Sequence, residues 1–197
     1  MSDNSVKIAI LFSGRGSNMQ ALAHHIAKAD VPAELVMTVT NRPDASGIKI
    51  CEAAGIACTV IDHKSFDSRE AFDAKLDETL RAADVELICC AGFMRLLTEG
   101  FVNGWPDRLL NIHPSLLPKY QGLHTHKRAL EAGDKIHGCT VHYMRPEMDN
   151  GPVILQKSVP VLDGDTPDML ADRVIDQEHN AYPEALDMVL KKIAGAT

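Results

Sequence analysis

Short apolar runs alternate with amphipathic stretches through the first half of the chain. Continuous apolar runs predict strands that are buried on both faces, and apolar positions three or four residues apart predict helices. This order predicts an α/β fold, a Rossmann-like, doubly wound and mostly parallel sheet with helices on both faces. The predicted strands span 6–12, 35–40, 58–61 and 85–90. One predicted helix follows the turn at 13–18, a second spans 47–54 and ends at Gly55, and a third spans 68–83 with Ser68 as its N-cap.

The second half begins with a strand at 109–113 that carries polar side chains on one face only. Because strand side chains alternate, Asn111 and His113 leave one face while Leu110 and Ile112 leave the other. Two further strands, at 138–144 and 152–161, are expected either to pair with each other or to extend the sheet.

A long helix is predicted to open at 165–167. Thr166 or Asp165 is the expected N-cap, and Pro167 fits the first turn of a helix. We expect this helix to run to about residue 181, where Pro183 breaks or kinks it before a final helix that ends at residue 193.

Length and charge limit what the chain can be. Its 197 residues fit one domain, and a net charge of -7 argues against a nucleic-acid binder, which usually carries a basic face. No apolar run reaches the roughly 20 residues that span a bilayer, and residues 1–5 lack the features of a signal peptide. We therefore expect a cytoplasmic protein that binds neither nucleic acid nor membrane.

Five cysteines occur without a Cys-x-x-Cys pair, so reduced thiols are expected rather than a disulfide framework or structural zinc. Five histidines lie between residues 113 and 142, and His124 and His126 are close in sequence. Carboxylates or thiolates at ligand spacing are missing around them, so we predict no metal site.

Three loops follow predicted strands, at 13–18, 91–97 and 113–118. In open α/β sheets, ligands lie beyond the carboxyl ends of the strands, so these loops are expected to converge on one cleft. Residues 14–18, Gly-Arg-Gly-Ser-Asn, suit an anion at a helix start. They form neither a Walker A loop nor Gly-x-Gly-x-x-Gly, so a monophosphate is favoured over a dinucleotide; the alternative is a structural turn.

Asn111 and His113 side by side could polarise a carbonyl and move a proton, although a locally satisfied polar pair is equally consistent with the pattern. Asp149 lies among turn-forming residues, and its functional role requires that it reach His113. Residues 92–97 could form an apolar wall for a flat heteroaromatic ring, or simply cover the core.

Taken together and in this order, five motifs resemble the folate-dependent formyltransferase family, in particular the phosphoribosylglycinamide formyltransferases of purine biosynthesis. The resemblance runs from about residue 7 to residue 193. The motifs are Ser13-Gly14-x-Gly16-Ser17-Asn18, Ala91-Gly92-Phe93-Met94-Arg95, the run from Leu110-Asn111-Ile112-His113-Pro114 through Pro118, Gly138-Cys139-Thr140-Val141-His142, and Asp149-x-Gly151-Pro152.

The resemblance implies formyl transfer from 10-formyltetrahydrofolate, as a co-substrate, to the amine of 5'-phosphoribosylglycinamide, without a metal. It also implies a single formyltransferase domain over 1–197, with a nucleotide-binding half at about 6–110 and a folate and catalytic half at about 85–193. It implies a catalytic set of Asn111, His113 and Asp149, nucleotide contacts from Gly16, Ser17, Asn18 and Glu178, and folate contacts from Arg69, Met94, Arg95, Leu96, Leu97 and Asn111.

Two other functions stay open at this point. Formyltetrahydrofolate deformylase uses the same Asn-x-His and Asp pattern with water in place of the amine, and a non-catalytic nucleotide- or folate-binding module would not need the trio. Arg15 stands where the family often has Asn, and Asn150 where Gly is common; Asn tolerates a positive φ, so the turn remains available. The quaternary structure expected is a monomer or a homodimer.

Overall fold

The computed structural model describes residues 5–28 and 30–195. Four of the five residues on which the signal-peptide prediction rests, 1–4, lie outside the described residues. Among the residues described, no helix is long and apolar enough to cross a bilayer. The five cysteines are all free, as expected, and burial raises the pKa of the Cys89 thiol to about 12.

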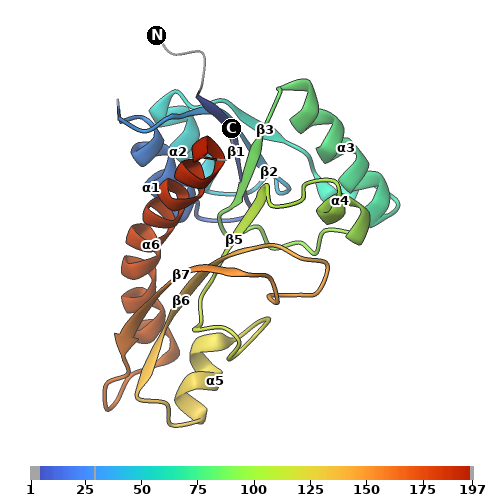
Figure 1. Ribbon diagram of the computed structural model, residues 1–197. Helices are drawn as coiled ribbons and strands as arrows, with labels where there is room; N and C mark the ends of the chain where they lie inside the picture. Colours follow the sequence, from blue (N-terminus) through green and yellow to red (C-terminus); the bar gives the residue numbers. More distant parts are fainter. Residues whose placement is uncertain (1–4, 29, 196–197) are drawn as a thin grey trace.

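Seven strands form one twisted sheet in the order β3-β2-β1-β4-β5-β6-β7 (Figure 1). The strands from β3 to β5 in this order pair in parallel. At the other end, β6 pairs antiparallel with both β5 and β7. The predicted α/β fold with a mostly parallel sheet is therefore confirmed. The strands are β1 (Val6–Phe12), β2 (Ala33–Thr40), β3 (Cys58–Val60), β4 (Leu87–Cys90), β5 (Leu109–His113), β6 (Ile136–Tyr143) and β7 (Val153–Pro160).

Helices cover both faces of the sheet, as the pattern predicted (Figure 1). One core cluster contains apolar residues of α1, α2 and α6, and the other contains apolar residues of α3 and α4. The helices are α1 (Ser17–Ile26), α2 (Gly47–Ala54), α3 (Arg69–Ala82), α4 (Glu99–Asn103), α5 (Thr125–Glu131) and α6 (Pro167–Gly195), with a 3-10 turn at His63–Ser65.

The local predictions hold best where capping signals agree with the apolar pattern. Ser68 accepts a hydrogen bond from the Ala71 N–H at 3.0 Å, and Gly55 adopts the left-handed conformation at the end of α2. Thr166, rather than Asp165, caps α6, since its hydroxyl accepts from the Met169 N–H at 3.2 Å. The 138–144 and 152–161 strands do both things expected of them, because β6 pairs with β7 and also extends the sheet beside β5.

Of the two outcomes expected at Pro183, a break or a kink, the break into two helices is wrong. Residues Pro167–Gly195 form one continuous helix with Pro183 inside it. A proline in a helix interior costs about 3 kcal/mol or more. Here Ala181, Tyr182, Ala185 and Leu186 are fully buried on both sides of it, and their packing against the sheet keeps the helix continuous.

Strand β5 has two different environments, and this positions the candidate site. Leu110 and Ile112 belong to the core cluster beneath α6, whereas Leu109 belongs to the cluster beneath α3 and α4. Alternation therefore places Asn111 and His113 on the α3 and α4 side of the sheet. The predicted separation of polar and apolar residues on this strand is confirmed.

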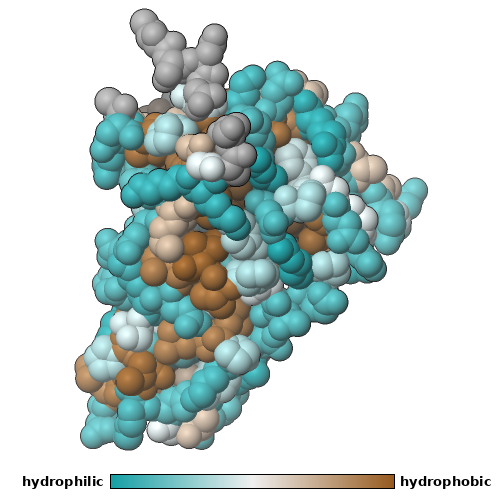
Figure 2. Space-filling model, in the orientation of Figure 1, coloured by the Kyte–Doolittle hydropathy of each residue, from teal (hydrophilic) through white to brown (hydrophobic). Residues whose placement is uncertain are grey.

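The surface carries apolar side chains over the part of the molecule where β7 and α6 lie (Figure 2). Val153, Leu162 and Met169 are each about half exposed there. The oligomeric state, predicted as monomer or homodimer, stays a prediction.

Gly138 in β6 gives a test of the sheet packing. A Cβ atom added there would overlap the backbone carbonyl of Lys157 in β7, and backbone cannot rotate away as a side chain can. We expect Gly138→Ala to lower the free energy of unfolding by about 2–3 kcal/mol, the upper part of the range for overpacking. Urea unfolding measures this, with Gly100→Ala in α4 as the matched control, because an added Cβ there meets nothing within 4 Å.

Candidate active site

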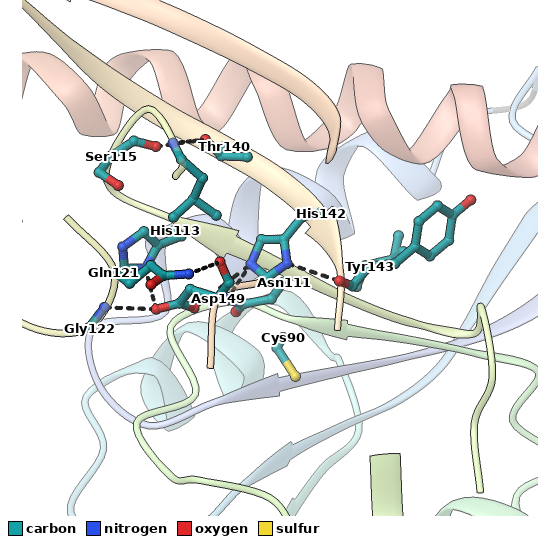
Figure 3. A network of polar contacts seen from close by, with 12 residues as sticks. Cys90, Asn111, His113, Ser115, Gln121, Gly122, Thr140, His142, Tyr143 and Asp149 are labelled. Carbon is teal, nitrogen blue, oxygen red and sulfur yellow. Dashed lines mark hydrogen bonds and ion pairs between the residues drawn. The ribbon is translucent and has the colours of Figure 1, made fainter. Parts of the chain in front are cut away.

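His113 and Asn111 lie on β5, next to antiparallel β6, and their register partners there are Thr140 and His142. Paired residues on neighbouring strands share a face, so these four polar side chains form one group on the sheet (Figure 3). His113 is buried and Asn111 is half-buried. The group is therefore shielded from bulk water, yet Asn111 remains accessible from the loop side.

Asp149 reaches this group from the connection between β6 and β7. Its Oδ2 atom lies 3.4 Å from His113 Nδ1, and its Oδ1 atom lies 3.8 Å from His142 Nε2. The Gly122 N–H donates to Oδ2 at 2.9 Å (Figure 3). The contact between Asp149 and His113, which the sequence could not establish, is present.

The backbone strain in this turn lies at Asp149 itself. Asp149 has a φ of 50°, whereas the expectation had placed a positive φ at Asn150. Asp is among the non-glycine residues that adopt this conformation more readily than most. Gly151 nearby is required for packing, because a Cβ there would overlap the Tyr143 carbonyl.

Both ring nitrogens of His113 face acceptors. Nε2 is 2.9 Å from the backbone carbonyl of Tyr120, and Nδ1 faces the carboxylate of Asp149. A neutral imidazole has one N–H and can donate to only one of them, whereas an imidazolium donates to both. His113 therefore has a hydrogen-bond acceptor at each of its ring nitrogens.

Asn111 is oriented by His142, a residue that the sequence analysis did not select. The Asn111 Nδ2 atom is 3.3 Å from His142 Nε2, and His142 Nδ1 is 2.9 Å from the Tyr143 carbonyl. Since a carbonyl only accepts, Nδ1 carries the hydrogen and Nε2 accepts from the amide. Burial lowers the pKa of His142, which keeps it neutral for this role. Only the strand register pairs the two residues, although the motif at 138–142 contains His142.

The glycine loop at 13–18 leads directly into α1. Gly16 has a φ of 77°, a conformation that favours glycine, and among the described residues no side chain caps the helix start. Asn18 Nδ2 donates to Glu178 Oε2 at 2.6 Å, which joins α1 to α6 across 160 positions. Burial raises the pKa of Glu178, while the Asn18 hydrogen bond and the charge of exposed Arg15 lower it. Ser17 is half-buried beside them.

The predicted folate-contacting residues lie on the loop after β4 and at the start of α3. Met94 and Leu96 are 67% and 53% exposed, unusual values for such side chains in a loop, while Leu97 packs against the core. Arg95 lies over the Phe72 ring, 4.4 Å from its centroid, and Arg69 is exposed one turn before Phe72 on α3. The structure thus brings Arg69 and residues 94–97 to one region.

Ser13 connects the glycine loop to the loop after β4. Its N–H donates to the Gly92 carbonyl at 3.1 Å, and its hydroxyl oxygen accepts from the Met94 N–H at 2.7 Å. The hydroxyl in turn donates to Asn41 Oδ1 at 2.5 Å. Ser13 and Asn41 are each 2% exposed. Two of the three predicted loops therefore meet directly, as the fold argument expected.

The histidines near α5 form a pair. His137 Nε2 is 3.2 Å from His126 Nδ1, and burial lowers the pKa of His137 to about 4. Across the described residues, no three His, Cys, Asp or Glu side chains are grouped as metal ligands. Half-buried His126 and buried His137 form a contact in which desolvation lowers the pKa of both rings.

The residues described above lie within the part of the chain that is similar to known proteins. A model of the formyl transferase family matches residues 6–186. The chain belongs to the formyl transferase family. The match includes the glycine loop, the 91–97 loop, β5 and the turn that carries Asp149.

Individual members of the family match most of the chain. Phosphoribosylglycinamide formyltransferase of Escherichia coli (strain K12) is 46% identical over 178 residues, which is 90% of this chain and 84% of that protein. The structure of glycinamide ribonucleotide transformylase 1 from Symbiobacterium toebii has a TM-score of 0.93 and 41% identity, covering 97% of this chain and 90% of that one.

A third relative is much longer. Trifunctional purine biosynthetic protein adenosine-3 of Gallus gallus is 48% identical over 186 residues, or 94% of this chain. This chain spans only 18% of that relative's length, so the similarity concerns one part of the longer protein.

Buried His137, in contact with half-buried His126, predicts a pH-dependent stability. Because the folded pKa of His137 is about 4 and a free histidine titrates near 6.5, the unfolded chain binds a proton in this window that the folded chain does not. We expect the free energy of unfolding to fall as the pH decreases from about 6.5 to about 4. His137→Asn should reduce that slope by up to about 1.4 kcal/mol per pH unit.

Urea unfolding at several pH values measures the slope, and exposed His24→Asn is the control, which should keep the wild-type slope. An unchanged slope in His137→Asn would contradict the assignment.

Proposed function

We propose that this chain transfers the formyl group of 10-formyltetrahydrofolate to the amine of 5'-phosphoribosylglycinamide in purine biosynthesis. The names of its relatives give a formyl transfer and a phosphoribosylglycinamide acceptor. The observation that carries the proposal is the contact between His113 and Asp149 beside Asn111, inside a chain of the formyl transferase family. A binding module has no need of a buried imidazole that faces two acceptors.

The trio suits attack of an amine on a formyl carbon. The formyl oxygen gains negative charge, and donors placed at that oxygen stabilise it. One N–H of Asn111 is given to His142, which fixes the amide, and the second remains for the oxygen. His113, which we propose acts as an imidazolium, contributes its positive charge near that oxygen, because its two N–H groups face Tyr120 and Asp149. One such donor is typically worth about 3–4 kcal/mol of barrier.

Asp149 has two roles in this proposal. Its carboxylate stabilises the positive charge on His113, and it accepts the proton that the attacking amine loses, directly or through water. Because Gly122 donates to the same carboxylate oxygen, the loop holds Asp149 in place while the proton moves. When the bond between the formyl carbon and N10 of the donor breaks, the proton that Asp149 accepted passes to N10, directly or through water, so tetrahydrofolate leaves and the protons balance.

The start of α1 suits the phosphate of the nucleotide. Backbone N–H groups at a helix start attract anions, and because Gly16 has no side chain, a phosphate can approach the backbone closely there. Ser17 and Asn18 add side-chain groups, and we assign Glu178 to the nucleotide because its carboxylate holds Asn18 in place.

The loop after β4 suits the folate. Exposed Met94 and Leu96, half-buried Leu97, and Arg95 over Phe72 present apolar area with a few polar groups, which a flat ring system requires. Exposed Arg69 suits an acidic tail of such a ligand. When bound, 10-formyltetrahydrofolate supplies the formyl group, and no metal enters this mechanism. The division into two halves and the cytoplasmic location remain predictions.

The purified chain should form formylated nucleotide only when both 10-formyltetrahydrofolate and 5'-phosphoribosylglycinamide are present. We expect His113→Ala to lower kcat by at least about 100-fold, because it removes both the positive charge proposed beside the oxygen and the partner that holds the Asp149 carboxylate. Product formation is followed by chromatography, and circular dichroism checks that the variant folds.

Release of formate without nucleotide would instead identify a deformylase, and binding without either product would identify a binding module. His24→Ala, at an exposed position of α1, is the matched control and should keep the wild-type rate.

Asp149→Asn separates the charge from the shape of this side chain. Asparagine still accepts the Gly122 N–H, but it cannot pair with an imidazolium. Since a hydrogen bond to a charged group is worth about 1.5–3 kcal/mol, kcat should fall by about 10- to 100-fold while nucleotide affinity changes by less than about threefold. Steady-state kinetics and nucleotide titration measure both; weakened binding with kcat unchanged would refute the proton role.

A further inference from the structure

We propose that Asp134, remote from the reacting atoms, is a positioning residue that fixes the orientation of the His113 imidazole through the segment Lys119–Tyr120–Gln121–Gly122, here called the 119–122 clamp. The role in catalysis rests on the proposed function, whereas the role in orienting the ring does not.

The clamp contacts both members of the proposed catalytic pair. The Tyr120 carbonyl lies 2.9 Å from His113 Nε2, and the Gly122 N–H donates to Asp149 Oδ2 at 2.9 Å. That same oxygen is the one 3.4 Å from His113 Nδ1. Three consecutive residues therefore set the positions of the ring and of the carboxylate relative to each other.

Tyr120 holds its carbonyl toward His113 in an unfavourable backbone conformation. Its φ is 57°, in the left-handed region that side chains other than glycine rarely adopt. Such a conformation persists only where the surrounding structure enforces it. The contacts that enforce it here do not involve the reacting groups.

Asp134, in the turn between α5 and β6, supplies those contacts. The Tyr120 hydroxyl donates to Asp134 Oδ2 at 2.9 Å, and Lys119 Nζ donates to both carboxylate oxygens at 3.0 Å. The hydrogen bonds from Lys119 and Tyr120 lower the pKa of Asp134, so it stays charged at neutral pH. One carboxylate thus anchors two neighbouring side chains of the clamp.

The remaining contacts make the clamp rigid around this anchor. Buried Ser115 donates its hydroxyl to the Lys119 carbonyl at 2.6 Å, and Arg128 donates to the Gln121 carbonyl at 2.6 Å. Arg128 also lies over the Tyr120 ring, 5.2 Å from its centroid. These contacts fix the backbone on both sides of Tyr120, and within the described residues the hydrogen bond of its hydroxyl goes to Asp134.

Loss of Asp134 should therefore let the Tyr120 carbonyl turn away from His113. With one acceptor gone, the ring is free to rotate or to hold its proton on Nδ1 alone. A displacement of about 1 Å in a catalytic group can lower a rate about 100-fold without affecting ligand contacts elsewhere. We expect the effect on turnover rather than on nucleotide binding, because the start of α1 is a separate site.

The test compares Asp134→Ala, Asp134→Asn and Tyr120→Phe in the full chain. Asp134→Ala should lower kcat by about 10- to 100-fold with the nucleotide KM within about threefold. Asn keeps one acceptor for the Tyr120 hydroxyl and should restore most of the rate, and Tyr120→Phe should give an intermediate loss. Asp163→Ala is the matched control, since Asp163 is fully exposed and its ion pair is a long one, 3.9 Å to Lys135.

Nitrogen-15 spectra of the histidine rings give the readout that does not depend on activity. In the wild type, Nε2 of His113 should appear protonated, and in Asp134→Ala and Tyr120→Phe its signal should move toward the unprotonated position. If this signal stays unchanged in both folded variants, or if kcat is unchanged in Asp134→Ala, the proposal is wrong. If the wild type transfers no formyl group but the signal moves as expected, the proposed function fails while the orienting role of Asp134 stands. Should Asp134→Ala not fold, Tyr120→Phe alone decides through the same spectrum.

Discussion

The contact between the Asp149 carboxylate and the His113 imidazole is the interaction on which the arrangement of the site depends. The strand topology does not by itself bring these two side chains together. Because β6 runs antiparallel to β5, it ends beside the start of β5, so the connection after it must return across the sheet to reach His113. The left-handed backbone at Asp149 and the hydrogen bond from Gly122 belong to that return. A buried polar contact is stable only when its remaining hydrogen-bonding groups are also satisfied, and here Tyr120 and Gly122 satisfy them.

Strand β5 separates stability from chemistry. On one face, Leu110 and Ile112 pack beneath α6, and the buried Tyr182 hydroxyl of that helix lies within hydrogen-bonding distance of the carbonyls of Cys90 and Leu110. On the other face, Asn111 and His113 point to the loops. The rigid face thereby supports the polar one. Groups on a strand are held more precisely than groups on a loop. Asn111 and His113 of the proposed trio have this advantage, whereas Asp149 comes from a loop.

Local signals in the sequence account for much of the fold, and non-local ones account for what was missed. The bounds of β1, α2 and β5 follow from apolar runs and caps that lie within the elements themselves. Pro183 was misjudged because the packing of α6 against the sheet outweighs a local preference. The partnership of Asn111 with His142 depends on the register of two strands, and that of His113 with Tyr120 depends on a carbonyl, which any residue type carries. The residues of the proposed trio were therefore readable, but most of the groups that orient them were not.

Ser13 restricts how far the two loops that it joins can move. Its two backbone-directed hydrogen bonds fasten the loop that begins at Gly14 to the one that contains Met94, and its hydroxyl is itself held by Asn41. The two loops cannot separate without leaving buried polar groups unpaired, which is costly. The positions of the two loops relative to each other are thus fixed before any small molecule arrives. The two loops therefore lose little conformational entropy when a ligand binds, and they do not separate to fit a ligand of a different length.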